Sequence, residues 1–382
     1  MRALVVVVGK RTEHWEGFFD ALSRRPDLEL VVQAADVSDL ARTRLRELAR
    51  ERENFAFRAC PHVVGEELTG HMASVLFRPD AWRGLRDTRP DVVHIIAEAA
   101  YLATYQALRA RNRFWPTTPV TLYAAQNVLT RFPFPFPAIE RYAYRHVSLA
   151  LPITPAALDV LRAKGYAGPA KVVPLGADLA RFRPRREPPP GPFTVGFVGR
   201  LEPWKGIADL LDARDRLGCR LLVVGDGSLR TWLEAEAARR GGAIDIVPWA
   251  SHDELPHLLA RMHALAFPSR EIVQRNVLPW IKVPLREQFG RVLVEAMASG
   301  VPTVSYRVGE IPHVVGDAGL VVDGDPSALA AGLARVRDEA DLAERLVGAG
   351  PSRAALFHWA RIADEMCETW SELSEDRHAR AA

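Results

Sequence analysis

The stretch from Glu287 to Gly300, EQFGRVLVEAMASG, carries two glutamates eight positions apart, Glu287 and Glu295. Its apolar run from Val292 to Ala298 has the composition of a buried helix. We expect Glu287 to lie in the loop before this helix, where Gly290 lets a ligand approach the backbone closely. Unpaired amides at a helix start, together with the positive end of the helix dipole, form an anion site. The amides concerned are those of Gly290, Arg291 and Val292.

A carboxylate beside such amides suits a sugar or a ribose, because hydroxyl groups donate hydrogen bonds to it. The alternative interpretation is a capped helix with two surface glutamates. We favour the ligand site, because a glycine and an exposed aromatic residue, Phe289, are poor choices at a helix start for stability alone.

Two basic residues, Arg200 and Lys205, stand in the segment GRLEPWKG, which follows an expected strand at 193–198. An arginine offers a planar fork and a lysine a point charge, a combination that suits a diphosphate. Ordinary surface bases would have the same composition. The position between a strand end and a helix start, beside Gly199, favours a binding role.

Two glycine segments are weaker signals. Gly9 ends the β-branched run 3–8 and is a candidate ligand-binding turn at a strand end, although any tight turn would use a glycine. Gly225-Asp226-Gly227 has the beginning of a dinucleotide-binding fingerprint, but the complete pattern does not follow. An NAD dehydrogenase is therefore the weakest functional interpretation.

Strands alternate with helices on both sides of a proline-rich segment, which predicts two doubly wound α/β domains. The expected domains are 1–183 and 193–356, joined by a semi-rigid linker, 184–192. A final helix at 357–375 has its apolar residues near helical spacing. In the first half we expect strands at 3–8, 91–96 and 120–124 and helices at 15–24, 37–52 and 97–111. In the second half we expect strands at 193–198, 221–224, 245–247, 265–268, 303–306 and 319–322.

Size and composition agree with two domains. The 382 residues are 48% apolar and 25% charged, and the formal net charge of +3 is too small to indicate a nucleic-acid partner. The three cysteines are scattered without metal or redox spacing, which favours a reducing compartment. No apolar run approaches the length of a membrane span, and the opening MRALVVVVG is too short for a signal peptide. We expect a cytoplasmic protein.

The pattern Glu-x-Phe-Gly-x-x-x-x-Glu followed by AMASGVP resembles the signature of family 4 glycosyltransferases, which are retaining enzymes with the two-domain GT-B fold. The resemblance covers the second domain nearly from end to end. Residues 173–182, with Gly176, Asp178 and Phe182, resemble a family segment at the end of the first domain. In GT-B proteins a C-terminal helix such as 357–375 crosses back onto the first domain.

The resemblance implies a role for each candidate residue. Glu295 would bind the ribose hydroxyls and Glu287 a hydroxyl of the donor sugar, with the amides of Phe289 and Gly290 also holding the sugar. Arg200 and Lys205 would neutralise the leaving diphosphate, so that no metal or cofactor is needed. The loop with Trp249 would lie near the nucleobase. The resemblance further implies a donor site in the second domain, a hydroxyl acceptor on the first, and the reaction in the cleft between them.

Three departures from the family pattern stand out. Many members carry a histidine at a strand end of the first domain, where this chain reads TLYAAQN, and Gln126 and Asn127 are the candidate substitutes. The turn at Gly309 has Glu310 and His313 in place of a glycine and a glutamate, which puts any role of this turn in doubt. The segment 270–286, with Trp280 and Lys282, is longer than usual and could border the acceptor or a partner chain.

The segment 126–146 alternates Phe132, Phe134 and Phe136 with prolines, so it cannot be a helix interior at that point. Such a loop could line an acceptor cleft, make a peripheral contact with a membrane, or pack down as a connection. An exposed apolar patch would favour one of the first two.

The sequence therefore predicts a metal-independent, retaining glycosyltransferase that uses a nucleotide-diphosphate sugar and a hydroxyl acceptor. A sugar-nucleotide 2-epimerase with the same architecture is one alternative, and a non-catalytic nucleotide-sugar-binding protein is another. The sequence names neither the base, the sugar, the acceptor nor the oligomeric state.

Overall fold

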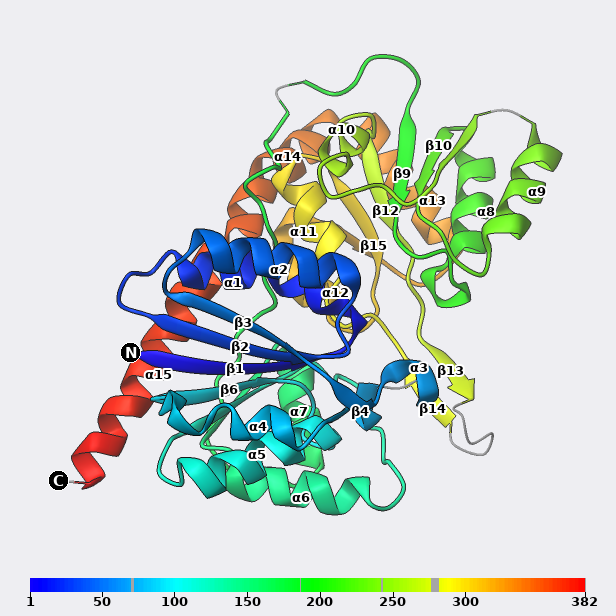
Figure 1. Cartoon of the computed structure of the whole chain (residues 1–382). Helices are drawn as coiled ribbons and strands as arrows, with labels where there is room; N and C mark the ends of the chain where they lie inside the picture. The colour runs from blue at the N-terminus through cyan, green and yellow to red at the C-terminus, as the bar shows by residue number, and fades with distance from the viewer. Residues whose placement is uncertain (70–71, 186, 242, 276–281, 382) are drawn as a thin grey trace. The chain divides into compact units, whose positions relative to one another are not determined.

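The computed structural model of the chain describes residues 1–382 except 70–71, 186, 242, 276–281 and 382. It divides into two compact units (Figure 1). The first unit comprises Met1–Leu175 and Trp359–Ala382, and the second comprises Gly176–His358. Residues 176–183, which we expected at the end of the first domain, group with the second unit, so the division falls between Leu175 and Gly176 rather than at the proline-rich segment 184–192.

The first unit contains a six-stranded parallel sheet with the strand order β3-β2-β1-β6-β7-β8. Its strands are β1 (Arg2–Val8), β2 (Glu29–Ala35), β3 (Phe55–Cys60), β6 (Val92–Ile96), β7 (Val120–Ala124) and β8 (Leu149–Pro152). The helices are α1 (Glu16–Ser23), α2 (Asp39–Glu51), α3 (Glu66–Thr69), α4 (Asp80–Arg83), α5 (Leu102–Phe114), α6 (Phe136–His146), α7 (Pro155–Ala163) and α15 (Trp359–Ala381). A short antiparallel pair joins β4 (His62–Val64) and β5 (Leu76–Phe77).

The continuous apolar run of β1 has a simple cause. Val5 and Val7 pack into one core, whereas Leu4 and Val6 pack into a second core on the other face of the sheet. Because successive side chains of a strand point to opposite faces, a strand covered on both sides must be apolar at every position.

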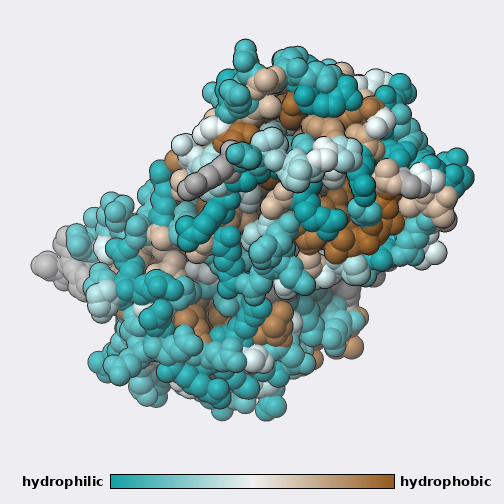
Figure 2. Space-filling model, turned by 90° about the horizontal axis from the view of Figure 1, so that it is seen from above, coloured by the Kyte–Doolittle hydropathy of each residue, from teal (hydrophilic) through white to brown (hydrophobic). Residues whose placement is uncertain are grey.

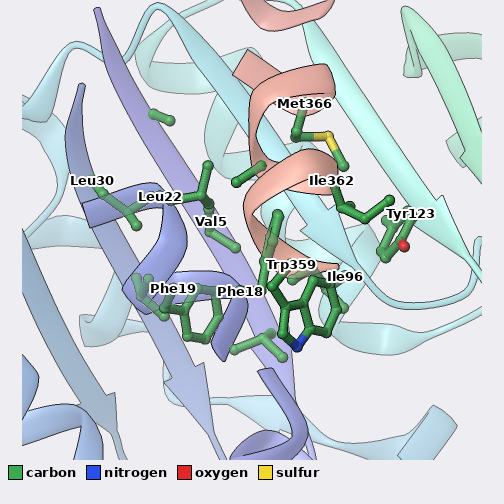
Figure 3. Packing of buried hydrophobic residues seen from close by; sticks show 14 of the residues in the cluster. Val5, Phe18, Phe19, Leu22, Leu30, Ile96, Tyr123, Trp359, Ile362 and Met366 are labelled. Atoms are coloured by element: carbon green, nitrogen blue, oxygen red, sulfur yellow. The ribbon is translucent and has the colours of Figure 1, made fainter. Parts of the chain in front are cut away.

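The C-terminal helix α15 returns to the first unit, as the sequence predicted. Figure 3 shows Trp359 and Ile362 of α15 among side chains from the sheet and from α1. The ring centroids of Trp359 and Phe18 lie 5.3 Å apart. A residue more than 300 positions from β1 in sequence is therefore part of the core that covers this strand.

The second unit repeats the same arrangement with the strand order β11-β10-β9-β12-β15-β16, again parallel. Its strands are β9 (Thr194–Val198), β10 (Arg220–Val224), β11 (Ile244–Val247), β12 (Ala264–Phe267), β15 (Thr303–Tyr306) and β16 (Leu320–Val322). Its helices are α8 (Ile207–Leu217), α9 (Arg230–Arg240), α10 (Leu255–Leu259), α11 (Arg291–Ala298), α12 (Ile311–Val315), α13 (Pro326–Asp338) and α14 (Ala340–Ala355). In both sheets the order reverses beside the first strand, and open α/β sheets bind ligands at such a point.

Most expected elements agree with the structure within two residues, but the helix expected at 97–111 begins only at Leu102. The residues before it form a loop at the end of β6, where the side chain of Glu98 accepts a hydrogen bond from the amide of Ala125 (2.8 Å). Residues 97–101 therefore form, instead of the first turn of the expected helix, a loop that contacts the end of β7.

The longer segment 270–286 contains an antiparallel pair, β13 (Ile272–Arg275) and β14 (Lys282–Leu285). Trp280 lies outside the described residues. The face of the molecule in Figure 2 is mostly hydrophilic, with apolar colour confined to separate patches. Among the helices described, none combines the length and apolarity needed to cross a membrane.

Candidate active site

Three loops of the second unit gather the basic and acidic residues that the sequence singled out. One loop leads from β9 to α8 and contains a short 3-10 helix, η4 (Pro203–Lys205). The second follows β12 at Ser269, and the third leads from β14 to α11. β9 and β12 are neighbouring parallel strands, so the loops at their carboxyl ends meet at one edge of the sheet.

A direct ion pair joins the first and third loops. Nζ of Lys205 lies 2.5 Å from Oε2 of Glu287, and the hydroxyl of Ser269 donates a hydrogen bond to the same oxygen (3.2 Å). Lys205 is only 8% exposed, and its ammonium stands 4.1 Å from the ring centroid of Trp204. Burial lowers the pKa of Lys205 below its usual value, and the charge of Glu287 opposes this shift. Glu287 lies in the loop before α11, as predicted.

Arg200 is exposed, and its guanidinium lies 5.5 Å from the centroid of Trp204. The ring of Trp204 therefore contacts both bases. Trp204 itself was not among the residues predicted for the site. Its position directly before Lys205 in the chain was the one feature of the sequence that could have indicated this contact. A cation beside an indole face gains electrostatic stabilisation while its charge stays available to a ligand.

The glycines of Gly225-Asp226-Gly227 serve the packing of this loop. A side chain on Gly225 would place its Cβ 1.9 Å from the carbonyl oxygen of Gly199, and one on Gly227 would lie 2.6 Å from that of Leu201. The amide of Leu201 donates to the carbonyl of Asp226 (2.8 Å). The two glycines thus allow the loop after β10 to lie against the segment that carries Arg200.

The start of α11 agrees with the prediction in one respect and differs in another. Gly290 precedes the helix with φ 77°, a left-handed conformation that a glycine adopts without strain. The expectation that Phe289 would be exposed was wrong: it is buried and packs edge-on against Phe357, with ring centroids 5.3 Å apart. Arg291 and Val292 form the first turn of α11.

The turn at Gly309 has a clear structural role. A Cβ at Gly309 would lie 2.4 Å from the carbonyl oxygen of Glu287, so this position needs a glycine for the two loops to touch. The following residue, Glu310, is buried. The turn therefore supports the backbone of the loop that carries Glu287.

Glu295 lies on α11 and is 6% exposed. Burial raises the pKa of its carboxyl group, and Arg291 and His252 act in the opposite direction. Nδ1 of His252 stands 4.0 Å from Oε1 of Glu295, and Asp178 contributes a further negative charge nearby. His252 and its neighbour Phe182, at 5.3 Å between ring centroids, were not expected in the site. Their positions in the sequence, far from α11, gave no signal that they would lie near Glu295.

Two further candidates, Trp249 and Gly9, lie outside the three loops described above. Trp249 follows β11 in the second unit and is 66% exposed. Gly9 belongs to the first unit, where its amide donates to the carbonyl of Ala35 (3.1 Å) and its φ is 103°. It is a turn at the carboxyl end of β1, as expected.

Gln126 and Asn127 follow β7 in the first unit. Oε1 of Gln126 accepts a hydrogen bond from Nζ of Lys164 (2.7 Å), and Asn127 is buried. The stretch TLYAAQN itself contains no carboxylate, but Glu98, from the end of the neighbouring β6, lies against this strand end. Burial raises the pKa of Glu98, and the amides of Ala125 and Gln126 oppose that shift.

In the part of the chain that the structure describes, no three His, Cys, Asp or Glu side chains gather in a way that could hold a metal ion. Lys205 is paired with Glu287, and the guanidinium of Arg200 lies near the same Trp204 ring that Lys205 contacts.

Residues 180–353 match the family of glycosyl transferases group 1. The D-inositol 3-phosphate glycosyltransferase of Segniliparus rotundus is 32% identical over 220 residues, which cover 52% of this chain and 46% of that protein. The glycogen synthase of Mycobacterium tuberculosis is 31% identical over 211 residues, which cover 52% of this chain and 47% of that protein. The chain thus spans about half the length of these curated relatives.

Solved structures resemble the chain over nearly its whole length. The sucrose-phosphate synthase from Thermosynechococcus elongatus has a TM-score of 0.74 at 17% identity and covers 98% of this chain and 99% of its own. The Anabaena protein HepE in complex with UDP-glucose has a TM-score of 0.70 at 18% identity, covering 97% and 100%. At these identities the likeness concerns the fold, and it confirms the GT-B architecture that the sequence predicted. The matched residues 180–353 include Arg200, Lys205, Glu287 and Glu295.

Proposed function

We propose that the protein is a glycosyltransferase that moves a sugar from a nucleotide-diphosphate sugar to a hydroxyl acceptor. The observation that carries the proposal is the largely buried pair of Lys205 and Glu287, with Arg200 and Trp204 nearby, in a segment that matches the glycosyl transferases group 1 family. A diphosphate needs cations, a sugar needs hydrogen-bond acceptors, and these loops supply both.

Lys205 is suited to stabilise the leaving diphosphate. Its ammonium is largely withdrawn from water, so its interaction with a bound anion is stronger than that of a surface lysine. Arg200 is exposed and can adjust to a second phosphate oxygen. Stabilising charge that develops at the leaving group is commonly the largest catalytic term, and removing one such group costs about 10² to 10³ in rate.

Glu295 is suited to bind the ribose of the donor. It is a buried carboxylate with His252 and Asp178 nearby, and ribose hydroxyls would satisfy its oxygens by donating hydrogen bonds. UDP-sugars are the first donors to test, because a protein of the same fold, HepE, has been solved with UDP-glucose.

The test is to incubate the protein with a panel of nucleotide sugars and to measure release of the nucleotide diphosphate, with and without hydroxyl acceptors. We expect release from one donor, stimulated by an acceptor. Conversion of the donor without an acceptor and without release would indicate the epimerase instead. Binding without either reaction would indicate a non-catalytic protein.

Matched variants make this test specific. Lys205→Met and Arg200→Met should lower the rate about 10² to 10³-fold. Arg239→Met removes an exposed arginine from α9 of the same unit and should leave the rate unchanged. Equal activity of Arg200→Met and Arg239→Met would contradict the role proposed for Arg200.

The reaction is proposed to need no metal, because Arg200 and Lys205 supply the positive charge that a divalent cation would bring. Activity should therefore survive EDTA. Loss of activity that Mg²⁺ or Mn²⁺ restores would show that the diphosphate is held in another way. The rate at fixed donor concentration, with and without the chelator, is the measurement.

The reaction is also proposed to retain the anomeric configuration by substitution on the same face, with a donor phosphate oxygen accepting the proton of the acceptor. One oxygen of Glu287 is already bound by Lys205 and Ser269, which makes this carboxylate a poor nucleophile. NMR of the product should show the donor's configuration. An inverted linkage would contradict the mechanism, and a trapped glycosyl adduct would remove only the same-face step.

A further inference from the structure

The aromatic loop before α6 has no part in the proposed reaction, and its tip is strongly exposed. Phe134 is 86% exposed and Leu129 is 47% exposed. The base of the loop is held in place: the rings of Phe132 and Phe136 lie 5.8 Å apart, and Nζ of Lys164 stands 5.5 Å from the centroid of Phe132. The loop thus presents an apolar tip on an anchored base, which contradicts the interpretation as a connection that merely packs down.

The two helices beside this loop have an uneven distribution of charge. Residues 102–146 contain six arginines and one acidic residue, Glu140, although the whole chain has a net charge of only +3. Glu140 is largely buried and paired with Lys164 (2.8 Å). Five of the arginines are exposed, namely Arg109, Arg113, Arg131, Arg141 and Arg145.

Four of these arginines lie on two neighbouring helices. The side-chain amide of Asn112 on α5 donates to the hydroxyl of Tyr142 on α6 (2.9 Å), so the helices lie side by side, as Figure 1 shows. Ala138, Arg141 and Arg145 are exposed at helical spacing and form one stripe of α6, which begins directly after the aromatic loop. Arg109 and Arg113 stand one turn apart on α5.

We infer that this surface, made of the loop 129–136 and the exposed arginines of α5 and α6, docks on a lipid bilayer that contains anionic headgroups. Aromatic side chains insert into the headgroup region, and arginines are attracted to its negative potential. A second copy of the chain fits this surface poorly, because a symmetric contact would bring the same positive charges together. The inference is independent of the proposed sugar transfer.

Sedimentation with lipid vesicles tests the inference. The protein should bind vesicles of phosphatidylcholine mixed with phosphatidylglycerol, and bind phosphatidylcholine alone much more weakly. Added salt should weaken the binding, because it screens exposed charges. Arg141→Ser combined with Arg145→Ser should reduce the partition coefficient by about fivefold for each arginine removed. Phe134→Ser should reduce it on the mixed vesicles as well.

The matched controls remove the same groups elsewhere. Arg46→Ser with Arg50→Ser takes two exposed arginines from α2 of the same unit, and Trp232→Ser takes an exposed aromatic residue from α9. Both controls should bind like the unchanged protein, and thermal unfolding should confirm that all variants fold. Absence of binding to the mixed vesicles, or equal effects of control and test variants, would overturn the inference. Self-association that depends on Phe134, seen by light scattering, would replace it with a contact between copies.

Discussion

At the scale of single residues, the burial of Glu295 has a direct consequence for ligand binding. Replacing it by glutamine keeps the shape but removes the charge, and hydrogen bonds to a charged acceptor are about twice as strong as neutral ones. We expect Glu295→Gln to weaken binding of the nucleotide diphosphate by about 1 to 2 kcal/mol. Titration calorimetry measures this change.

The pH dependence of the same titration gives a second check on Glu295. Because burial raises the pKa of this carboxyl, binding to the unchanged protein should weaken as pH falls and the group takes up a proton. Glu295→Gln should lack this part of the dependence. The control variant Glu234→Gln, on the exposed side of α9, should have the same affinity as the unchanged protein at each pH. Unaltered affinity of Glu295→Gln would remove Glu295 from the site.

At the scale of elements, the turn into α8 decides where Lys205 lies. Gly206 has φ 71°, and a Cβ there would meet the carbonyl oxygen of Pro268 at 2.0 Å. Gly218, at the other end of α8, has φ 65° and open space around it. The two glycines therefore share a left-handed backbone and differ in their surroundings.

The corresponding variants separate backbone strain from steric conflict. Gly218→Ala should cost about 1 to 2 kcal/mol of unfolding free energy, the cost of a left-handed residue with a side chain. Gly206→Ala should cost more than that, and should also lower activity, because the backbone at Pro268 must shift beside Ser269 and Glu287. Urea unfolding and the rate of sugar transfer are the measurements. Similar losses of stability in the two variants would contradict the close approach at Gly206.

At the scale of the whole molecule, the first unit contains a histidine whose charge state is coupled to folding. His94 on β6 is fully buried, and Nδ1 is 2.8 Å from the hydroxyl of Thr121. Its ring lies 5.1 Å from that of Trp370 on α15 and 6.3 Å from that of Phe18 on α1. Burial lowers the pKa of His94 to about 3.

This shift makes the first unit less stable in acid. Between the ordinary pKa of about 6.5 and the folded value of about 3, the unfolded chain binds a proton that the folded chain does not. Stability from this group is present above about pH 6.5 and falls by about 1.4 kcal/mol for each pH unit below it. Urea unfolding from pH 6.5 to 4 should show this slope in addition to the slopes of other groups.

Comparing the unchanged protein with His94→Leu isolates the contribution of His94 to the pH dependence of stability. The raised pKa of Glu98 stabilises the fold as pH falls, but this effect is present in both proteins. The variant loses the contact with Thr121 and should be less stable at neutral pH, but its stability should fall less steeply in acid. Parallel slopes in the two proteins would contradict a neutral, buried His94.

The sequence by itself determined the alternation of strands and helices, the two-domain architecture, and the placement of Glu287 in a loop before a helix with Glu295. These features depend on periodicity, on turn residues and on short spacing, which are local properties of a chain. The return of the last helix to the first unit was also predicted, from the family resemblance.

The tertiary structure alone decided which groups meet. Lys205 and Glu287 are 82 positions apart, and only the order of β9 and β12 in the sheet brings their loops together. The contacts of His252 with Glu295 and of Glu98 with Ala125 likewise form only in the folded chain. The burial of Phe289 and the packing role of Gly225 depend on neighbours from distant segments. Such contacts follow from strand order and loop packing, which local composition does not encode.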